Sequence, residues 1–279
     1  NEIIVKASPS IQKGDTIKYS VRSFSKEQAR SIGDVLKRMP GIEVLSDGKI
    51  LYQGRPINKY YIEGLDLLEG KYNLANENLP FKEVTQVQIL ENHQPIKSLD
   101  SLKFSDQAAL NIKLKNTYTF TGQAHLGSGF SPLLWDANIT PMLFTKKKQM
   151  LATYQANNTG DNVASQLKKL TIEDLLNQFE NNSEKTDWLS IQQLTTPNFS
   201  EKRWLDNNIH LLSGNYLHKL KSDYELRVNA SYLNDYQQQN GFTNTEFITP
   251  SNTITILEEK QNHFFFNSLQ TNITLQKNA

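Results

Sequence analysis

The residues of this sequence that could do chemistry are few and widely scattered. The histidines are His93, His125, His210, His218 and His263. No two of them are four residues apart, and none has the carboxylate spacing of a zinc site. Cysteine is absent, which excludes disulfide bonds, thiolate metal ligands and cysteine nucleophiles. The sequence therefore predicts no metal site and no cofactor.

Two carboxylates, Glu63 and Asp66, are spaced closely enough to work together as an acid and a base. They also flank Gly64, and a glycine turn between two acidic side chains explains the pair without any chemistry. The sequence has no Gly-x-Ser-x-Gly motif, no phosphate-binding loop and no glycine-rich dinucleotide fingerprint. We therefore expect that the protein is not an enzyme.

Composition excludes two further classes of protein. Lys and Arg number 30 and Asp and Glu 29, so the net charge of +1 creates no field that attracts nucleic acid or an anionic lipid surface. No apolar run approaches the roughly 18 residues of a membrane-spanning helix. Membrane-spanning strands are a separate case, because each needs only about 10 residues of alternating polarity.

The chain changes character near Asn116. Before this residue, short apolar segments alternate with Gly and Pro, and their patterns predict a small α+β unit. Ser31 is placed to cap a helix whose apolar residues share one face, and Pro40 with Gly41 ends that helix. Strands are expected at residues 42–45, 50–52, 60–62, 84–90 and 109–114, and helical segments at residues 31–39 and 81–83.

After Asn116, polar and apolar residues alternate along runs of about ten residues. From Tyr118 the even positions are apolar or small and the odd positions are polar. Short turns are expected at residues 145–148 and 218–222, and one long loop at residues 158–207. Short turns at one end and long loops at the other are typical of an outer-membrane β-barrel. A soluble β-sandwich shows the same alternation, so alternation alone leaves both architectures open.

Four segments of the N-terminal unit follow one another in a specific order. They are Ser31-Ile-Gly-Asp-Val-Leu-Lys-Arg-Met-Pro-Gly-Ile-Glu-Val44, Tyr61-Ile-Glu-Gly-Leu65, Leu79-Pro-Phe-Lys-Glu-Val-Thr-Gln-Val-Gln-Ile89 and Ser105-Asp-Gln-Ala-Ala-Leu-Asn-Ile112. Together they resemble the plug domain of TonB-dependent outer-membrane receptors, over about residues 14–115. Glu63 stands where that family has Asp, and the last segment lacks the family's glycines.

The resemblance implies an α+β plug domain followed by an antiparallel transmembrane β-barrel in the cell outer membrane. An acidic residue followed by apolar β-formers resembles the TonB box, which pairs with a sheet edge of TonB by strand addition. The TonB-contact residues are then Glu2, Ile3, Ile4 and Val5. On the plug side, Tyr72 and Asn73 are the candidates for substrate contact, in a loop expected at the plug apex.

What the resemblance implies about function is active import of a substrate that binds at the cell surface. The implied partners are TonB with its inner-membrane energising complex, outer-membrane lipid and a surface lipoprotein that acts as a lid. The substrate would be a small molecule, a glycan or a peptide, and nucleic acid is not among the partners. The alternative is a plug-containing binding, signalling or assembly component of the outer membrane that transports nothing itself.

The strand count indicates an incomplete barrel. About seven strand-like runs start near Tyr118, Trp135, Gln149, Ile209, Tyr224, Thr245 and Phe264. Plugged outer-membrane transporters have about 22 strands, and seven strands cannot close around a plug of about 100 residues. We therefore expect a piece of a longer receptor, with a TonB-box-like segment at residues 1–13, a plug at 14–116 and the N-terminal part of the barrel at 117–279.

Overall fold

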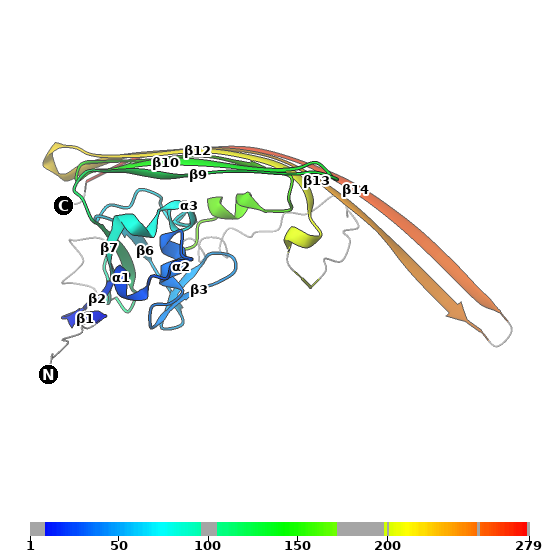
Figure 1. The fold of residues 1–279 in the computed structure, drawn as a ribbon, viewed down its shortest axis with the longest axis horizontal. Coiled ribbons are helices and arrows are strands. Elements are labelled where there is room, and N and C mark those ends of the chain that lie inside the picture. The colour runs from blue at the N-terminus through cyan, green and yellow to red at the C-terminus, as the bar shows by residue number, and fades with distance from the viewer. Residues whose placement is uncertain (1–8, 96–104, 172–197, 200, 250–251, 278–279) are drawn as a thin grey trace.

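The structure is a computed structural model that describes residues 9–95, 105–171, 198–199, 201–249 and 252–277. Its described part is mostly β-sheet with few helices. The N-terminal unit, residues 9–115, lies against one face of a large curved sheet formed by the rest of the chain (Figure 1). No helix among the described residues is long and apolar enough to cross a membrane.

The N-terminal unit is organised around a five-stranded sheet in the order β1-β2-β7-β8-β6. Its strands are β1 (Ser10–Lys13), β2 (Thr16–Ser20), β6 (Lys59–Ile62), β7 (Val84–Leu90) and β8 (Ala109–Leu114). Neighbours are antiparallel except β6 and β8, which run parallel. The strands predicted at residues 60–62, 84–90 and 109–114 are confirmed. β1 lies inside the segment 1–13 that the sequence sets apart, yet it pairs with β2 in this sheet.

Short strands and helices complete the unit. They are β3 (Ile42–Val44), β4 (Ile50–Tyr52), β5 (Arg55–Pro56), α1 (Val21–Phe24), α2 (Ile32–Leu36), α3 (Asn73–Asn78) and the 3-10 turn η1 (Phe81–Glu83). The helix predicted from Ser31 is confirmed as α2, and Asp34 accepts a hydrogen bond from the Ser31 N–H at 3.3 Å. α2 is shorter than predicted.

Helix α3 was not predicted, because its sequence Asn-Leu-Ala-Asn-Glu-Asn has little helix propensity. Packing stabilises it instead: Leu74 and Ala75 are fully buried in the core. Gly33 of α2 lets the two helices approach closely, since a Cβ atom there would lie 2.8 Å from the Asn76 carbonyl oxygen. Tertiary contacts, and not local helix propensity, therefore make residues 73–78 helical.

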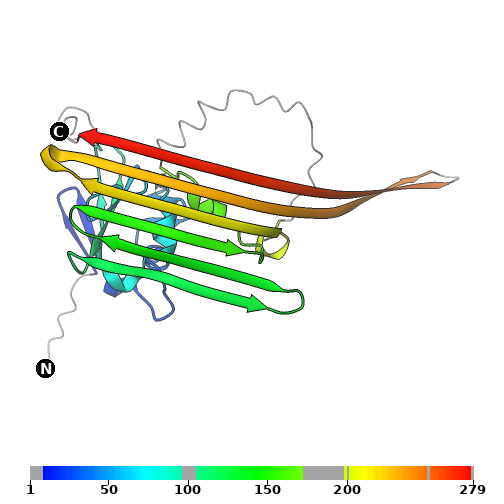
Figure 2. The same ribbon diagram turned by 90° about the horizontal axis from the view of Figure 1, so that it is seen from above.

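The large sheet has six antiparallel strands among the described residues, in the order β14-β13-β12-β11-β10-β9 (Figure 2). They are β9 (Thr119–Gly129), β10 (Leu134–Phe144), β11 (Lys148–Asn157), β12 (Asp206–Lys219), β13 (Tyr224–Ile248) and β14 (Thr253–Lys277). The prediction of about seven strands is wrong. Thr245 and Phe264 lie inside β13 and β14, because these two strands pair along their whole length as one long hairpin.

Both short turns lie at the same end of the large sheet. The turn predicted at residues 145–148 is confirmed, with the Thr145 N–H donating to the Lys148 carbonyl at 2.8 Å. The second turn is displaced to residues 220–223, because His218 and Lys219 remain paired with β13. The long connection runs between β11 and β12, and its residues 172–197 and 200 lie outside the described residues. It contains the 3-10 turns η3 (Val163–Leu167) and η4 (Glu201–Arg203).

The two faces of the large sheet have opposite character. The face toward the N-terminal unit buries polar side chains, whereas the face turned away exposes large apolar ones. The buried polar residues include Thr140, Thr153, Gln155, Ser213, Asn215, Arg227, Asn229 and Ser231. The exposed apolar residues include Phe120, Leu126, Ile139, Leu212, Phe265, Leu269, Ile273 and Leu275. The alternation predicted from Tyr118 onward is thus confirmed as two distinct faces.

One hydrophobic core joins the two parts of the chain. Met142, Phe144, Leu151 and Leu217 of the large sheet are buried together with the core side chains of the N-terminal unit. These residues lie near the end of the sheet that carries the short turns. Burial of this shared apolar surface fixes where the N-terminal unit sits.

Candidate functional site

The loop between β6 and α3, residues 63–72, carries three carboxylates that have different partners, and we call it the Glu69 loop. Glu63 forms an ion pair with Lys113 at 3.0 Å. Asp66 pairs with Lys59 at 3.2 Å and accepts a hydrogen bond from the backbone N–H of Glu69. Glu63 and Asp66 therefore hold the loop in shape, and each is occupied by a separate partner.

Glu69 links this loop to the large sheet. One carboxylate oxygen, Oε1, accepts hydrogen bonds from Arg227 Nη1 at 2.6 Å and Thr274 Oγ1 at 3.0 Å. The other, Oε2, accepts from Asn229 Nδ2 at 3.2 Å and from Asn272 Nδ2. Glu69 also has a positive φ of 46°, which is unusual for a residue with a side chain. We call these five residues the Glu69 cluster.

Burial and hydrogen bonding act on the Glu69 carboxyl in opposite directions. Burial alone raises its pKa, but the hydrogen bond and the positive charge of Arg227, together with hydrogen bonds from Thr274 and Asn272, outweigh that effect. The pKa of Glu69 therefore lies below its ordinary value, and the carboxylate is charged at neutral pH. The Glu69 and Arg227 side chains are only 16% and 7% exposed, so this is a largely desolvated ion pair.

The start of the long connection folds back over the N-terminal unit. We call residues 158–171 the inner segment. The Leu170 N–H donates to the Gly70 carbonyl at 3.1 Å, and the Gln166 amide donates to Glu77 Oε2 at 2.6 Å. Hydrogen bonds thus join the inner segment to the Glu69 loop at Gly70 and to helix α3 at Glu77.

Both residues predicted to contact substrate are buried, and the inner segment covers one of them, Tyr72. Tyr72 is fully buried, stacks on Tyr60 with ring centroids 5.3 Å apart, and donates its hydroxyl proton to the Leu170 carbonyl at 3.3 Å. Asn73 is 1% exposed and donates to the Asp47 carbonyl at 3.2 Å. Asn73 begins helix α3 and Tyr72 immediately precedes it, so a short helix stands where a loop was expected. Their contact with substrate stays a prediction.

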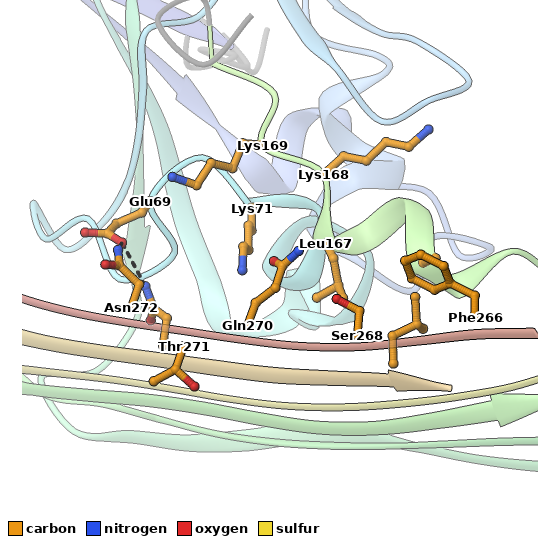
Figure 3. A pocket seen from close by; sticks show the side chains of 13 residues that line it. Glu69, Lys71, Leu167, Lys168, Lys169, Phe266, Ser268, Gln270, Thr271 and Asn272 are labelled. Atoms are coloured by element: carbon orange, nitrogen blue, oxygen red, sulfur yellow. Dashed lines mark hydrogen bonds between the residues drawn. The ribbon is translucent and has the colours of Figure 1, made fainter. Parts of the chain in front are cut away.

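A cavity of about 720 Å³ lies between the Glu69 loop, the inner segment and strands β13 and β14 (Figure 3). Its two ends differ in chemistry. Lys71, Lys169, Glu69 and Asn272 lie toward one end, and Leu167 and Phe266 lie toward the other. A cavity of this size accommodates a small organic molecule.

Glu77 on α3 is a titratable group near the inner segment. Desolvation of its carboxyl by surrounding protein atoms, and the negative charge of Asp161, raise the pKa of Glu77 to about 7. The residue as a whole is nevertheless exposed. Lys37, Lys202 and the hydrogen bond from Gln166 act in the opposite direction.

We expect the Glu77 carboxyl to titrate near pH 7 when its ¹³C chemical shift is followed in the full-length protein. Between the ordinary value of 4.5 and about 7 the folded state binds a proton that the unfolded chain has lost, so the stability contributed by Glu77 is lost as pH rises through this window. The hydrogen bond from Gln166 favours the charged carboxylate and opposes that loss. Because Glu77 is exposed, the effect on global stability is small, and proteolysis of the inner segment is the second readout. Glu77→Gln should remove the pH dependence of that proteolysis, and a midpoint near 4.5 would contradict the prediction.

The histidines occupy structural positions. Three of them contact tyrosine hydroxyls: His93 with Tyr61 at 2.9 Å, His210 with Tyr154 at 3.0 Å and His263 with Tyr236 at 2.7 Å. In the part of the chain that the structure describes, no three His, Asp or Glu side chains come together as metal ligands. The predicted TonB-contact residues 2–5 lie outside the described residues.

Sequence reasoning missed the Glu69 cluster and the cavity. One signal was available, since Arg227 is a charged residue on the otherwise small and polar inward face of a strand-like run. Its partner Glu69 is 158 residues away along the chain, and no local pattern connects the two.

Comparison with known proteins gives solved structures only. No family model matches the chain, and no curated protein matches it. The alcaligin outer membrane receptor FauA from Bordetella pertussis is 12% identical with a TM-score of 0.32, covering 95% of this chain and 48% of that one. The siderophore receptor PirA from Pseudomonas aeruginosa is 14% identical with a TM-score of 0.33, covering 95% and 44%. The ferric-catecholate import receptor Fiu from E. coli K12 is 11% identical with a TM-score of 0.28, covering 96% and 46%.

The chain therefore spans less than half the length of these receptors. Identities and TM-scores this low carry no argument about its function.

Proposed function

We propose that this chain is part of a TonB-dependent outer-membrane receptor that binds a substrate at the cell surface and imports it through a plugged β-barrel. The observation that carries the proposal is the polarity of the large sheet. Apolar side chains are exposed on its outer face, and polar ones are buried on its inner face against the N-terminal unit. Water-soluble sheets are arranged the other way, because their apolar face packs into the core. Lipid outside and a filled lumen inside account for this reversed pattern.

In this proposal the segments of the chain have distinct roles. Residues 14–116 act as the plug, and residues 117–279 form the N-terminal part of the barrel. Residues 2–5, within the segment 1–13, are captured by TonB, which transmits energy from the inner-membrane complex. The substrate is a small molecule, a glycan or a peptide, and a surface lipoprotein serves as the lid.

The proposal also orients the large sheet in the membrane. If β9 rises from the periplasmic side of the plug, each following strand reverses direction. The turns at residues 145–148 and 220–223 then face the periplasm, and the connection between β11 and β12 faces the cell surface. The inner segment is the part of that connection that reaches back toward the plug.

We expect spin labels on neighbouring positions of β14 to respond oppositely in the full-length receptor reconstituted in lipid bilayers. Leu269 lies on the outer face, and Gln270 points into the cavity, so both positions have room for a label. A label at Leu269→Cys should be relaxed strongly by dissolved oxygen, which concentrates in lipid. A label at Gln270→Cys should be relaxed more strongly by a water-soluble nickel chelate. Equal responses at the two positions would rule out a lipid-facing outer surface.

A further inference from the structure

A second cavity, of about 330 Å³, lies between helices α2 and α3, the turn from β3 to β4, and strand β9. Asn73 and Asn76 of α3 line it and are only 1% and 2% exposed, so they form its most buried wall. Figure 1 shows α2, α3 and β3 on the side of the N-terminal unit that lies away from the short turns. In the proposed orientation, substrate arrives from this side. We call this space the α2–α3 cavity.

The amide oxygens of these two asparagines lack donors. Asn73 Oδ1 and Asn76 Oδ1 are both buried, and neither has a hydrogen-bond partner in the described part of the chain. The Asn73 amide nitrogen donates to the Asp47 carbonyl at 3.2 Å, which fixes the orientation of that amide. A buried acceptor without a donor is destabilising, and most such oxygens in proteins are matched. A ligand that fits this cavity therefore supplies hydrogen-bond donors.

Two glycines make room for the asparagine side chains. A Cβ atom on Gly48 would overlap the Asn73 amide, and one on Gly33 would lie 2.8 Å from the Asn76 carbonyl oxygen and 3.0 Å from its Nδ2. Gly48 also has a φ of +86°, a conformation that favours glycine. The fold thus holds both amides in place at the wall of the cavity.

The charged residues around the α2–α3 cavity balance one another. Arg30 and Lys37 are basic, Asp34 and Glu77 are acidic, and no other described residue that lines the cavity carries a charge. The two asparagines add neutral amides to this lining. Such a lining has no excess of one sign that would select an ionic ligand.

We propose that the α2–α3 cavity binds one neutral sugar ring of a glycan, with two of its hydroxyl groups donating to Asn73 Oδ1 and Asn76 Oδ1. Because a hydroxyl both donates and accepts, the same ring also accepts from donors in the less buried wall, such as Lys37 and Gln123. The inference rests on the proposed function, because it selects the glycan from its three substrate classes.

The size of the cavity and the spacing of donors favour a sugar over a peptide. A volume of about 330 Å³ lies at the lower end of the range for ligand sites, which fits a single ring. A peptide backbone offers one N–H donor per residue, whereas neighbouring hydroxyls of one ring supply several donors within a small space.

An array of neutral oligosaccharides, with an array of short peptides beside it, tests the proposal on the full-length receptor in detergent. We expect retention on neutral glycans. For a glycan that binds, Asn76→Leu should lower the affinity at least tenfold, because a sugar hydroxyl loses its acceptor, and Asn76→Asp should retain most of it. Asn116→Leu changes an exposed asparagine outside the cavity lining and should leave the affinity unchanged.

Retention on peptides alone, or on no neutral glycan, would overturn the proposal. Wild-type affinity in folded Asn76→Leu would overturn it too, since the glycan would then bind elsewhere and ordered water would satisfy the asparagine oxygens.

A measurement on the wild-type receptor covers the case in which Asn76→Leu does not fold. Leu45 at the cavity and Ile11 on β1 are both exposed, at 40% and 62%. Hydroxyl-radical oxidation of Leu45, followed by mass spectrometry, should slow at least threefold with saturating glycan, while oxidation of Ile11 stays the same. Unchanged oxidation of Leu45 would place the glycan outside the cavity. None of these measurements involves TonB or uptake, so the sugar site can fail while the transport proposal stands.

Discussion

Replacing Arg227 with methionine is expected to loosen the N-terminal unit from the large sheet. The substitution leaves the Glu69 carboxylate desolvated, with only the neutral donors Asn229, Asn272 and Thr274. Removing one partner of a buried ion pair costs about 3 kcal/mol, which is roughly a hundredfold in the equilibrium between the attached and detached states. Urea titration of the full-length receptor, followed by proteolysis of the N-terminal unit, measures this change.

Two comparisons make the Arg227 experiment specific. Lys219→Met removes a lysine whose ion pair with Asp223, 3.5 Å long, is exposed, and it should cost less than about 0.5 kcal/mol. Combining Arg227→Met with Glu69→Leu should recover most of the lost stability, because no charge is then left buried without a partner. If Arg227→Met and Lys219→Met had the same urea midpoint, the Glu69 cluster would not be an anchor.

Ile4→Pro is expected to abolish energised uptake. In the proposed function, residues 2–5 add as a strand to the edge of the TonB sheet, and such pairing depends on backbone N–H donors. Proline at position 4 removes one donor and cannot pair within a ladder. Affinity of the full-length receptor for the purified periplasmic domain of TonB should fall at least tenfold. Cells that depend on this receptor for a nutrient should stop growing on it.

Ile4→Val is the matched control, because it keeps the backbone donor and a β-branched side chain. Its TonB affinity should stay within about twofold of wild type, a change of roughly 0.4 kcal/mol. Substrate binding should survive in the Pro variant, since the substrate binds from the opposite side of the plug. Normal uptake by Ile4→Pro would place the TonB-contact segment elsewhere in the protein. Normal TonB binding without any uptake in wild type would favour the alternative of a receptor that signals or assembles without transport.

The sequence by itself determined the elements whose stabilising contacts are local. Alternation from Tyr118 onward defined the strands and the two faces of the large sheet, because successive side chains of a strand point to opposite faces. Ser31 and Asp34 defined the start of α2, because a capping interaction spans only three residues. The strands at residues 84–90 and 109–114 were also predicted from local signals, because each has its own pattern of apolar residues between turn residues.

Only the tertiary structure decided the features that join distant parts of the chain. The Glu69–Arg227 pair, the inner segment over Tyr72 and the cavity around Lys71 all depend on how the N-terminal unit sits against the large sheet. Helix α3 forms in a sequence with little helix propensity because burial of Leu74 outweighs that preference. The strand count was missed because the β13–β14 ladder continues past Thr245, and ladder pairing is a property of two strands together. Local patterns fix which face a side chain takes, whereas its partner depends on the packing of the whole chain.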